Sequence, residues 1–284
     1  MRRSTDGSSS PSSNGTDFDG KVVVLAGASS GINLAIAQRF ATLGASTVVL
    51  SRDRDRIERA AQQISETGGQ CMGLVADVRD PDDVKRAYER TSEVYGSIDV
   101  VVSGAAGNFL APVLGLSPNA FRTVVDIDLN GTFNVLSLAW PFLTKPGASL
   151  ISITAPQATR PTMLQAHACA AKAGVNMLTK VLAMEWGPAG VRVNAISPGF
   201  IENTEGTARL IDTPEKAEAL RSSIPLRRLG DTGDIADLAV FLCRAESRFI
   251  TGSVIDCDGG YILGSADADA LSLDDSVGGV VSAH

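Results

Sequence analysis

The stretch KVVVLAGASSGIN, residues 21–33, decides how this chain folds. Its first half, Lys21 to Ala26, is a continuous apolar run of strand length. Gly27 and Gly31 follow in a turn that leads into a helical pattern, with apolar residues at positions 34, 36, 37, 40 and 43. A turn without β-carbons lets the backbone close around a pyrophosphate, and the free N–H groups and dipole of the helix favour its charge. Between a first strand and a first helix, such a turn predicts a dinucleotide site.

Every residue of this turn is a predicted cofactor contact, and the set is Gly27, Ala28, Ser29, Ser30, Gly31 and Ile32. The alternative is that the small residues serve only the packing of the helix on the strand. Asn33 stands where a third glycine is usual in such loops. It therefore predicts less close packing between helix and strand at this point.

The end of the next strand, Thr47 to Leu50, indicates which dinucleotide binds. An Asp or Glu here usually accepts hydrogen bonds from the ribose hydroxyls of NAD(H). This chain has Ser51 and Arg52 instead, and a cation suits the 2′-phosphate of NADP(H). The sequence therefore predicts NADP(H). The alternative is that Arg52 is an ordinary loop charge, and Asp53 lies close by in the sequence.

Apolar strands alternate with helical patterns along the rest of the chain. Strands are expected at 70–75, 98–102, 150–154, 191–196 and 253–257, and helices at 54–66, 81–95, 118–143, 162–187 and 236–242. Strands without polar alternation are typical of a parallel sheet that helices cover on both faces. We predict an α/β fold with a doubly wound parallel sheet in a single domain, residues 18–264. A disordered tail at 1–17 and a flexible tail at 265–284 are expected to flank it.

Composition and charge argue against several classes of function. A chain of 284 residues with a net charge of −7 has no excess of cations for nucleic acid or an anionic membrane. No apolar run approaches the roughly 18 residues of a membrane span. The four cysteines have neither metal-ligand nor disulfide spacing, so we expect no metal. The start of the chain lacks the apolar stretch of a secretory signal, and Ser282-Ala283-His284 is a poor match to a peroxisomal address, so a cytoplasmic protein is expected.

Lys172 is the main candidate for chemistry in the second half of the chain. It lies in a helical pattern among small residues such as Ala171, Ala173 and Gly174, which would let a flat molecule lie against the helix. The alternative is an ordinary solvated lysine. Ligands of doubly wound sheets bind beyond the carboxyl ends of the strands. The loops at 27–33, 103–108, 154–158 and 198–204 are all expected at that edge.

These motifs, in this order, resemble the short-chain dehydrogenase/reductase family. They are the glycine turn, Asp77-Val78, AAG at 105–107, Lys172, and Pro198-Gly199 followed by Thr204. The resemblance covers about residues 18–262. It implies a nicotinamide cofactor that contacts further residues of the same edge: Asp77, Val78, Ser103, Ala105, Lys172, Pro198, Gly199, Ile201 and Thr204.

The family's usual catalytic pattern is broken in this chain. Ala168 stands where a tyrosine is usual four residues before the lysine, Ala155 replaces a serine, and Asp128 replaces an asparagine. Of the usual four residues, only Lys172 is present. This loss resembles the peroxisomal type of 2,4-dienoyl-CoA reductase, as do the segments AAGNFLAP (105–112), LSPNAFRTVVDIDLNGTFNV (116–135) and QAHACAAKAG (165–174). The resemblance implies NADPH-dependent reduction of a 2,4-dienoyl-CoA, or a related enoyl-CoA thioester, to an enoyl-CoA in the degradation of unsaturated fatty acids.

The missing tyrosine is consistent with that chemistry. Reduction of a ketone requires a proton on the oxygen as the hydride arrives. Hydride addition to the far carbon of a dienoyl thioester gives an extended enolate, whose oxygen needs hydrogen-bond donors and whose carbon takes a proton later. Asp128, in a helical pattern among apolar residues, is the predicted proton source, through a water, if burial disfavours its charged form. The alternative is a helix-capping or salt-bridging Asp.

The resemblance also implies how the substrate binds and how the chain assembles. Cations near the mouth would meet the phosphates of coenzyme A, and apolar or small polar residues would line the acyl path. The predicted residues are Arg52, Arg79 and Arg209 for the CoA part, and Phe109, Ser117, Pro118 and Asn119 for the acyl path. A homotetramer is implied, in which the helices around 118–143 and 162–187 pack across two-fold axes.

Two other functions stay open from the sequence. One is a carbonyl or alcohol oxidoreductase that recruits another acid, for which His167 is the nearest candidate. The position of His167, one residue before Ala168, turns its side chain by about 100° on a helix, so a core or surface histidine is the alternative. The other function is a catalytically silent NADP-binding protein, because such a protein would also lack the serine and the tyrosine.

Overall fold

Seven parallel strands form one sheet in the order β3-β2-β1-β4-β5-β6-β7. This computed structural model describes residues 17–208 and 213–264, so Arg209 and almost all of both expected tails lie outside the described residues. The strands are β1 (Val22–Ala26), β2 (Ser46–Ser51), β3 (Gln70–Val75), β4 (Val100–Ser103), β5 (Ser149–Ile153), β6 (Arg192–Pro198) and β7 (Val254–Cys257). The strand order reverses between β1 and β4, which is where such folds bind ligands. The predicted doubly wound parallel sheet is confirmed.

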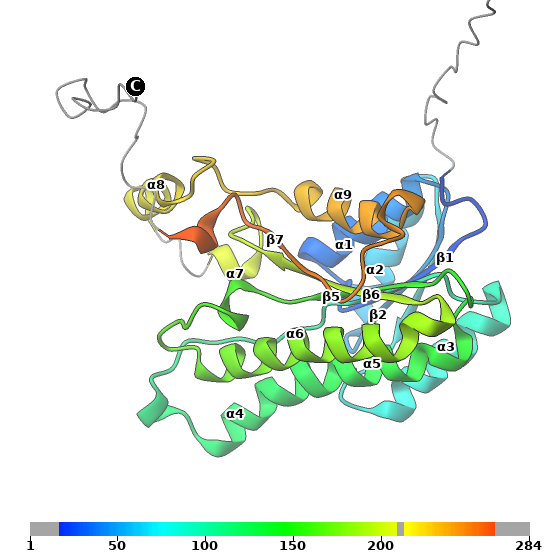
Figure 1. Ribbon diagram of the computed structural model, residues 1–284, viewed down its shortest axis with the longest axis horizontal. Helices are drawn as coiled ribbons and strands as arrows, with labels where there is room; N and C mark the ends of the chain where they lie inside the picture. The colour runs from blue at the N-terminus through cyan, green and yellow to red at the C-terminus, as the bar shows by residue number, and fades with distance from the viewer. Residues whose placement is uncertain (1–16, 209–212, 265–284) are drawn as a thin grey trace, which may run out of the picture.

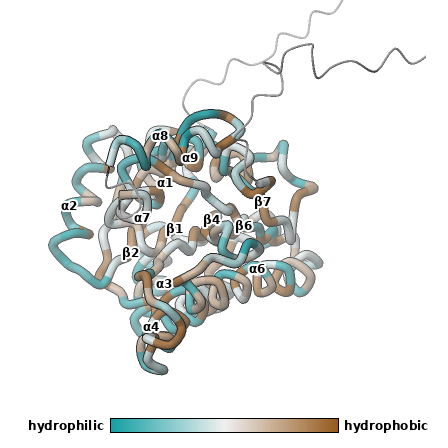
Figure 2. The backbone as a smooth tube through the Cα atoms, turned by 90° about the vertical axis from the view of Figure 1, so that its left-hand side faces the viewer, coloured by the Kyte–Doolittle hydropathy of each residue, from teal (hydrophilic) through white to brown (hydrophobic). Residues whose placement is uncertain are grey.

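Helices cover both faces of the sheet (Figure 1). On one face lie α1 (Gly31–Thr42), α2 (Arg54–Ser65) and α9 (Thr232–Cys243), and on the other lie α3 (Pro81–Tyr95), α5 (Gly131–Ala139) and α6 (Ala166–Trp186). Because successive side chains of a strand point to opposite faces, Val23 and Leu25 pack in the first layer and Val22 and Val24 in the second. This double burial explains the unbroken apolar run of β1. Figure 2 shows the run in the hydrophobic colour, in contrast to the hydrophilic colour along much of α2.

The strand register brings the predicted site loops together. Ala26 at the end of β1 is level with Ser103 at the end of β4, and Ser103 is level with Ser152 on β5. The loops after these strands therefore leave the sheet at one edge, as the sequence predicted. The backbone reinforces this, because the Gly104 N–H donates to the Ala26 carbonyl at 3.1 Å.

The long helix predicted over 118–143 is present as one continuous helical run over 118–142, but it is not α-helical throughout. The segment is α4 (Pro118–Val125), a π-helical turn (Asp126–Asn130) and α5, followed by a 3₁₀ turn (Trp140–Phe142). Gly131 packs so closely that a β-carbon there would lie 2.6 Å from the Val78 side chain, and Pro141 has no N–H to continue an α-helix. The π turn carries Asp128, and such turns are frequent at functional sites.

Two helices were not expected from the sequence, α7 (Glu205–Ala208) and α8 (Pro214–Ser223). The start of α8 had a local signal, since the Thr213 side chain accepts from the Lys216 N–H at 3.3 Å and Pro214 occupies the first turn. Within the described ranges, no helix has the length and apolar character needed to cross a membrane.

Candidate active site

The glycine turn has the geometry of an anion cradle. Gly27 and Gly31 have φ values of +75° and +61°, a region that favours glycine. A β-carbon on Gly27 would lie 2.6 Å from the backbone of Ala105. The first turn of α1 holds no acidic residue, and the side chain of its N-cap residue, Ser30, makes no capping hydrogen bond within the described chain. The N–H groups at the start of α1 are thus available, and the turn suits the pyrophosphate of a dinucleotide.

Asn33 does not loosen this turn as the sequence predicted. Its side chain is buried, and its Nδ2 donates to the carbonyls of Gly27 at 3.2 Å and Gly104 at 2.9 Å. The amide therefore joins the glycine turn to the end of β4. Helix and strand pack closely here because Gly104 leaves room for the larger residue.

The predicted adenine end of the cofactor site lies at the ends of β2 and β3. Arg79 donates from Nε to both carboxylate oxygens of Asp77, at 3.0 and 3.1 Å. This hydrogen bonding, with a smaller contribution from the charge of Arg52, lowers the pKa of Asp77 below its usual value. Arg52 itself is exposed beside Ser51. Val78 is buried, and its carbonyl accepts from Asn134 Nδ2 at 2.9 Å.

Asp128 and Lys172 form a buried pair. Asp128 is 1% exposed and Lys172 is 7% exposed, and Lys172 Nζ lies 3.5 Å from Asp128 Oδ2. Lys172 Nζ also donates to the carbonyl of Ile153 at 3.0 Å, and Asp128 Oδ1 accepts from the Gly107 N–H at 2.7 Å. Lys172 is therefore not a solvated helix lysine. The pair links α6, the end of β5, the π turn and the loop after β4.

Short hydrogen bonds hold the π turn in place. Thr132 Oγ1 donates to the Asp128 carbonyl at 2.7 Å, and Ser103 Oγ lies 3.2 Å from that same hydroxyl. Tyr88 Oη donates to the Val135 carbonyl at 2.6 Å, and burial raises the pKa of Tyr88, which keeps it protonated as a donor. These contacts fix the start of α5 against β4 and α3, and with it the direction of the Asp128 side chain.

The small residues around Lys172 have a packing role that the sequence did not reveal. A β-carbon on Gly174 would lie 2.8 Å from the Leu129 side chain. Gly174 therefore lets α6 approach the π turn, which brings Lys172 within reach of Asp128. Gly174 thus has a packing role, and the expectation that the small residues beside Lys172 leave room for a flat molecule stays a prediction.

A cluster of side-chain amides is formed by residues close in sequence to the two alanines and by Asn108. Ala168 is buried and Ala155 is half-buried. Nearby, Gln165 Oε1 accepts from Asn108 Nδ2 at 2.8 Å and from Gln157 Nε2 at 3.2 Å. Sequence reasoning missed this cluster because its members come from three separate segments.

His167 lies in the core, and its described contacts are with Ala168 and Phe109. It is fully buried, its Nδ1 accepts from the Ala168 N–H at 3.0 Å, and its ring meets that of Phe109 edge to face at 4.5 Å between centroids. This burial agrees with the core histidine that the sequence offered as an alternative to a catalytic acid.

The predicted acyl-path residues lie at the surface near the start of α4. Phe109 is 38% exposed, and Ser117 caps α4 by accepting from the Ala120 N–H at 3.1 Å. Pro118 and Asn119 form the exposed first turn of that helix. Arg79 points to Asp77, and Arg209 lies outside the described residues.

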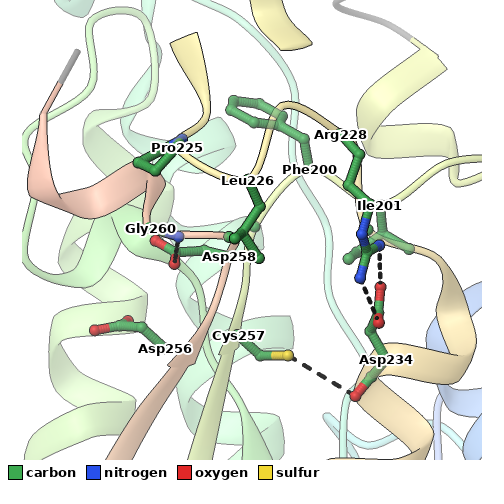
Figure 3. A pocket seen from close by; sticks show the side chains of 13 residues that line it. Phe200, Ile201, Pro225, Leu226, Arg228, Asp234, Asp256, Cys257, Asp258 and Gly260 are labelled. Carbon is green, nitrogen blue, oxygen red and sulfur yellow. Dashed lines mark hydrogen bonds and ion pairs between the residues drawn. The ribbon is translucent and has the colours of Figure 1, made fainter. Parts of the chain in front are cut away.

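The loop after β6 borders a cavity of about 500 Å³ beyond the ends of β6 and β7 (Figure 3). Gly199 approaches Asp258 so closely that a β-carbon on it would lie 2.6 Å from the Asp258 Cα, and Thr204 Oγ1 donates to the Ile201 carbonyl at 2.8 Å. Arg228 holds Asp234 on one wall with hydrogen bonds of 2.7 and 2.9 Å. In the part of the chain that the structure describes, the lining includes Gly199 and Ile201 but neither Asp128 nor Lys172.

No cluster of metal-ligating side chains occurs among residues 17–208 and 213–264.

A nucleotide cradle and a buried Lys–Asp pair at the carboxyl edge of a doubly wound sheet define a nicotinamide-dependent oxidoreductase. The family described as enoyl-(acyl carrier protein) reductase matches residues 27–262. The chain belongs to the short-chain dehydrogenase/reductase family.

Individual proteins similar to this chain are known within and beyond one named activity. The chain is 40% identical over 249 residues to peroxisomal 2,4-dienoyl-CoA reductase [(3E)-enoyl-CoA-producing] of Danio rerio, covering 87% of this chain and 83% of that one. It is 38% identical over 255 residues to the protein of that name in Arabidopsis thaliana, covering 86% and 85%. A short chain dehydrogenase from Bacillus anthracis has a similar solved structure, with a TM-score of 0.79 and 38% identity over 85% of this chain and 96% of that one.

Proposed function

We propose that this protein catalyses NADPH-dependent reduction of a 2,4-dienoyl-CoA, or a related enoyl-CoA thioester, to an enoyl-CoA in the degradation of unsaturated fatty acids. The observation that carries the proposal is the buried Asp128–Lys172 pair beside Ala155 and Ala168. Without the tyrosine and the serine, the site lacks the usual proton donor for a ketone oxygen. It still has Asp128, which can supply a proton to the carbon of an enolate. The names of the zebrafish and Arabidopsis relatives support this reading.

The cofactor would be held by the glycine turn, the ends of β2 and β3, and Lys172, and when bound it supplies the hydride. Lys172 has donors for a ribose hydroxyl while its ammonium group remains against Asp128 and the Ile153 carbonyl. Its positive charge also favours the build-up of negative charge on the substrate. The amide N–H groups of Asn108 and Gln157 are candidate donors to the thioester oxygen.

Asp128 is the proposed proton source for the enolate carbon. Asp128 would pass a proton, through a water, to the carbon next to the thioester carbonyl. The carboxylate left behind is stabilised by the Gly107 N–H at 2.7 Å and by the ammonium group of Lys172 at 3.5 Å. Lys172 thus supplies the counter-charge of that carboxylate, and bulk water would return the proton before the next turnover.

The preference for NADP(H) over NAD(H) is proposed from Arg52. Its exposed guanidinium lies near enough to Asp77 to lower the pKa of that carboxyl, so it stands at the adenine end of the site. A 2′-phosphate would gain a charge-assisted contact there that NADH cannot make.

A homotetramer is proposed from the outer faces of α5 and α6. Met177, Val181 and Met184 of α6 lie at spacings that share one face and are 60%, 41% and 80% exposed, and Phe133 of α5 is 50% exposed. Light scattering on the purified chain measures the assembly, and a monomer would refute the proposal.

The proposed compartment is the cytoplasm, whereas the relatives compared above are named peroxisomal. Imaging of the full chain tests this.

The test of function is NADPH oxidation against a panel of a 2,4-dienoyl-CoA, a 2-enoyl-CoA and simple ketones. We expect turnover of the dienoyl-CoA, with one double bond lost per NADPH consumed, and no turnover of the ketones. Reduction of the ketones alone would indicate a carbonyl reductase. Cofactor binding without turnover of any member would overturn the proposed reaction.

A further inference from the structure

Asn33 forms a bridge between two segments that are 71 residues apart. Its Nδ2 donates to the carbonyl of Gly27 in the glycine turn and to the carbonyl of Gly104 at the end of β4. The N–H groups of these same two glycines are already bound, to the carbonyls of Leu50 at 2.9 Å and Ala26 at 3.1 Å. With the Asn33 contacts, both the N–H and the carbonyl of each glycine have a hydrogen-bond partner.

The orientation of the Asn33 amide follows from its partners. Both contacts are to carbonyl oxygens, which only accept, so the side chain must present its NH₂ group to them. Its Oδ1 is buried and has no hydrogen-bond partner among the described residues. A buried acceptor without a partner costs stability. The amide therefore combines two hydrogen bonds that position the loops with one unpaired acceptor that lowers their net stabilising effect.

Asn33 and Gly104 are complementary in volume. A β-carbon on Gly104 would lie 2.6 Å from Asn33 Cγ and closer still to its amide atoms. The backbone of Gly104 does not have a positive φ, and the three atoms nearest to that β-carbon all belong to Asn33, so an alanine there would require the Asn33 side chain to move. By contrast, Gly27 is required by its positive φ and by the backbone of Ala105.

We propose that Asn33 and Gly104 act as one positioning unit that fixes the glycine turn against the end of β4 and so sets the affinity for the nicotinamide cofactor. The turn receives the pyrophosphate, which NADPH and NADH share. The unit therefore acts on both cofactors equally, whereas Arg52 acts on the 2′-phosphate of one. This inference does not depend on the identity of the acyl-CoA substrate.

A double-mutant cycle tests the unit with Asn33→Ala, Gly104→Ala and the double variant. The matched control is Gly187→Ala, where a β-carbon meets no atom within 4 Å. Dissociation constants for NADPH and for NADH are measured by fluorescence titration well below each variant's melting temperature, and melting temperatures are recorded without cofactor. Asn33→Asp, which keeps the volume but removes the donors, is measured in parallel in case the smaller side chain prevents folding.

We expect Asn33→Ala and Asn33→Asp to raise both dissociation constants by about tenfold, the effect of losing two ordinary hydrogen bonds. Gly104→Ala should raise them at least as much in the presence of Asn33, and add no further loss when residue 33 is alanine. The proposal fails if the Asn33 variants melt earlier yet bind both cofactors as the wild type does. It also fails if Gly104→Ala is equally damaging in both backgrounds, or if only NADPH binding changes.

Discussion

The cofactor cradle and the reaction pair lie at the same edge of the sheet, but they depart from the family pattern to different degrees. The cradle keeps the two glycines and an open helix N-terminus, and its one departure, Asn33, is matched by Gly104. The reaction side has alanines at two positions where hydroxyl residues are usual, and a buried carboxyl group, Asp128, where an asparagine is usual. The cradle depends on backbone geometry, which most substitutions at its glycines would disturb. The proposed reaction depends instead on a few side chains. The two regions therefore differ in what they preserve: the cradle has the backbone geometry usual in the family, and the reaction side lacks the family's usual hydroxyl groups.

The largest expected effect is at Asp128. Asp128→Asn keeps the volume and removes the proton source, so we expect turnover of a dienoyl-CoA to fall by a factor on the order of 10² or more. Binding of NADPH and of acyl-CoA should change little. The control is Asp126→Asn, two residues earlier in the same π turn. A fully active Asp128→Asn variant would contradict the proposed chemistry, because an asparagine is the residue usual in this family.

The next effect is expected at Lys172. Lys172→Met keeps much of the volume but leaves the Asp128 carboxyl buried without its counter-charge. We expect turnover to fall at least tenfold and the free energy of unfolding to fall by about 3 kcal/mol. Urea denaturation and steady-state kinetics measure the two effects.

Addition of Asp128→Asn to Lys172→Met checks that the two residues form one unit. The neutral amide removes the unpaired charge, so the double variant should regain part of the lost stability but none of the activity. Fully additive losses in both measurements would show that the two residues act independently.

The comparison also separates what the sequence could predict from what it could not. The strand, turn and helix at 21–42 were predictable because each depends on neighbouring residues: an apolar run, glycines with positive φ, and an apolar helical stripe. The π turn was not, and its contacts join residues far apart in the sequence, Gly131 with Val78 and Asp128 with the Gly107 N–H. For the same reason the bridge at Asn33 was interpreted as a loss of packing. Asp128 and Lys172 were identified from the residue pattern, but their contact required the fold.

A smaller effect, confined to one cofactor, is expected at Arg52. Arg52→Asp should weaken NADPH binding by about tenfold or more, equivalent to about 1.4 kcal/mol. NADH binding should not weaken, because an acidic residue here can accept from its ribose hydroxyls. Arg54→Asp is the matched control, because Arg54 is exposed two residues further on and pairs with Glu58 at 3.5 Å. Equal affinity of the wild type for the two cofactors would remove the basis for NADP(H).

The smallest effect is expected at the ion pair of Asp77 and Arg79, whose side chains are 24% and 40% exposed. The hydrogen bonds from Arg79 lower the pKa of Asp77 in the folded state. A lowered carboxyl pKa stabilises the fold above the unfolded pKa of about 3.9, and the stabilisation is lost as the pH falls through the folded value. Because solvent screens a partly exposed pair, Arg79→Met should lower the free energy of unfolding by less than about 1 kcal/mol at pH 7. In urea denaturation the difference from the wild type should shrink as the pH falls below about 4, and a difference that grew there would contradict this account of Asp77.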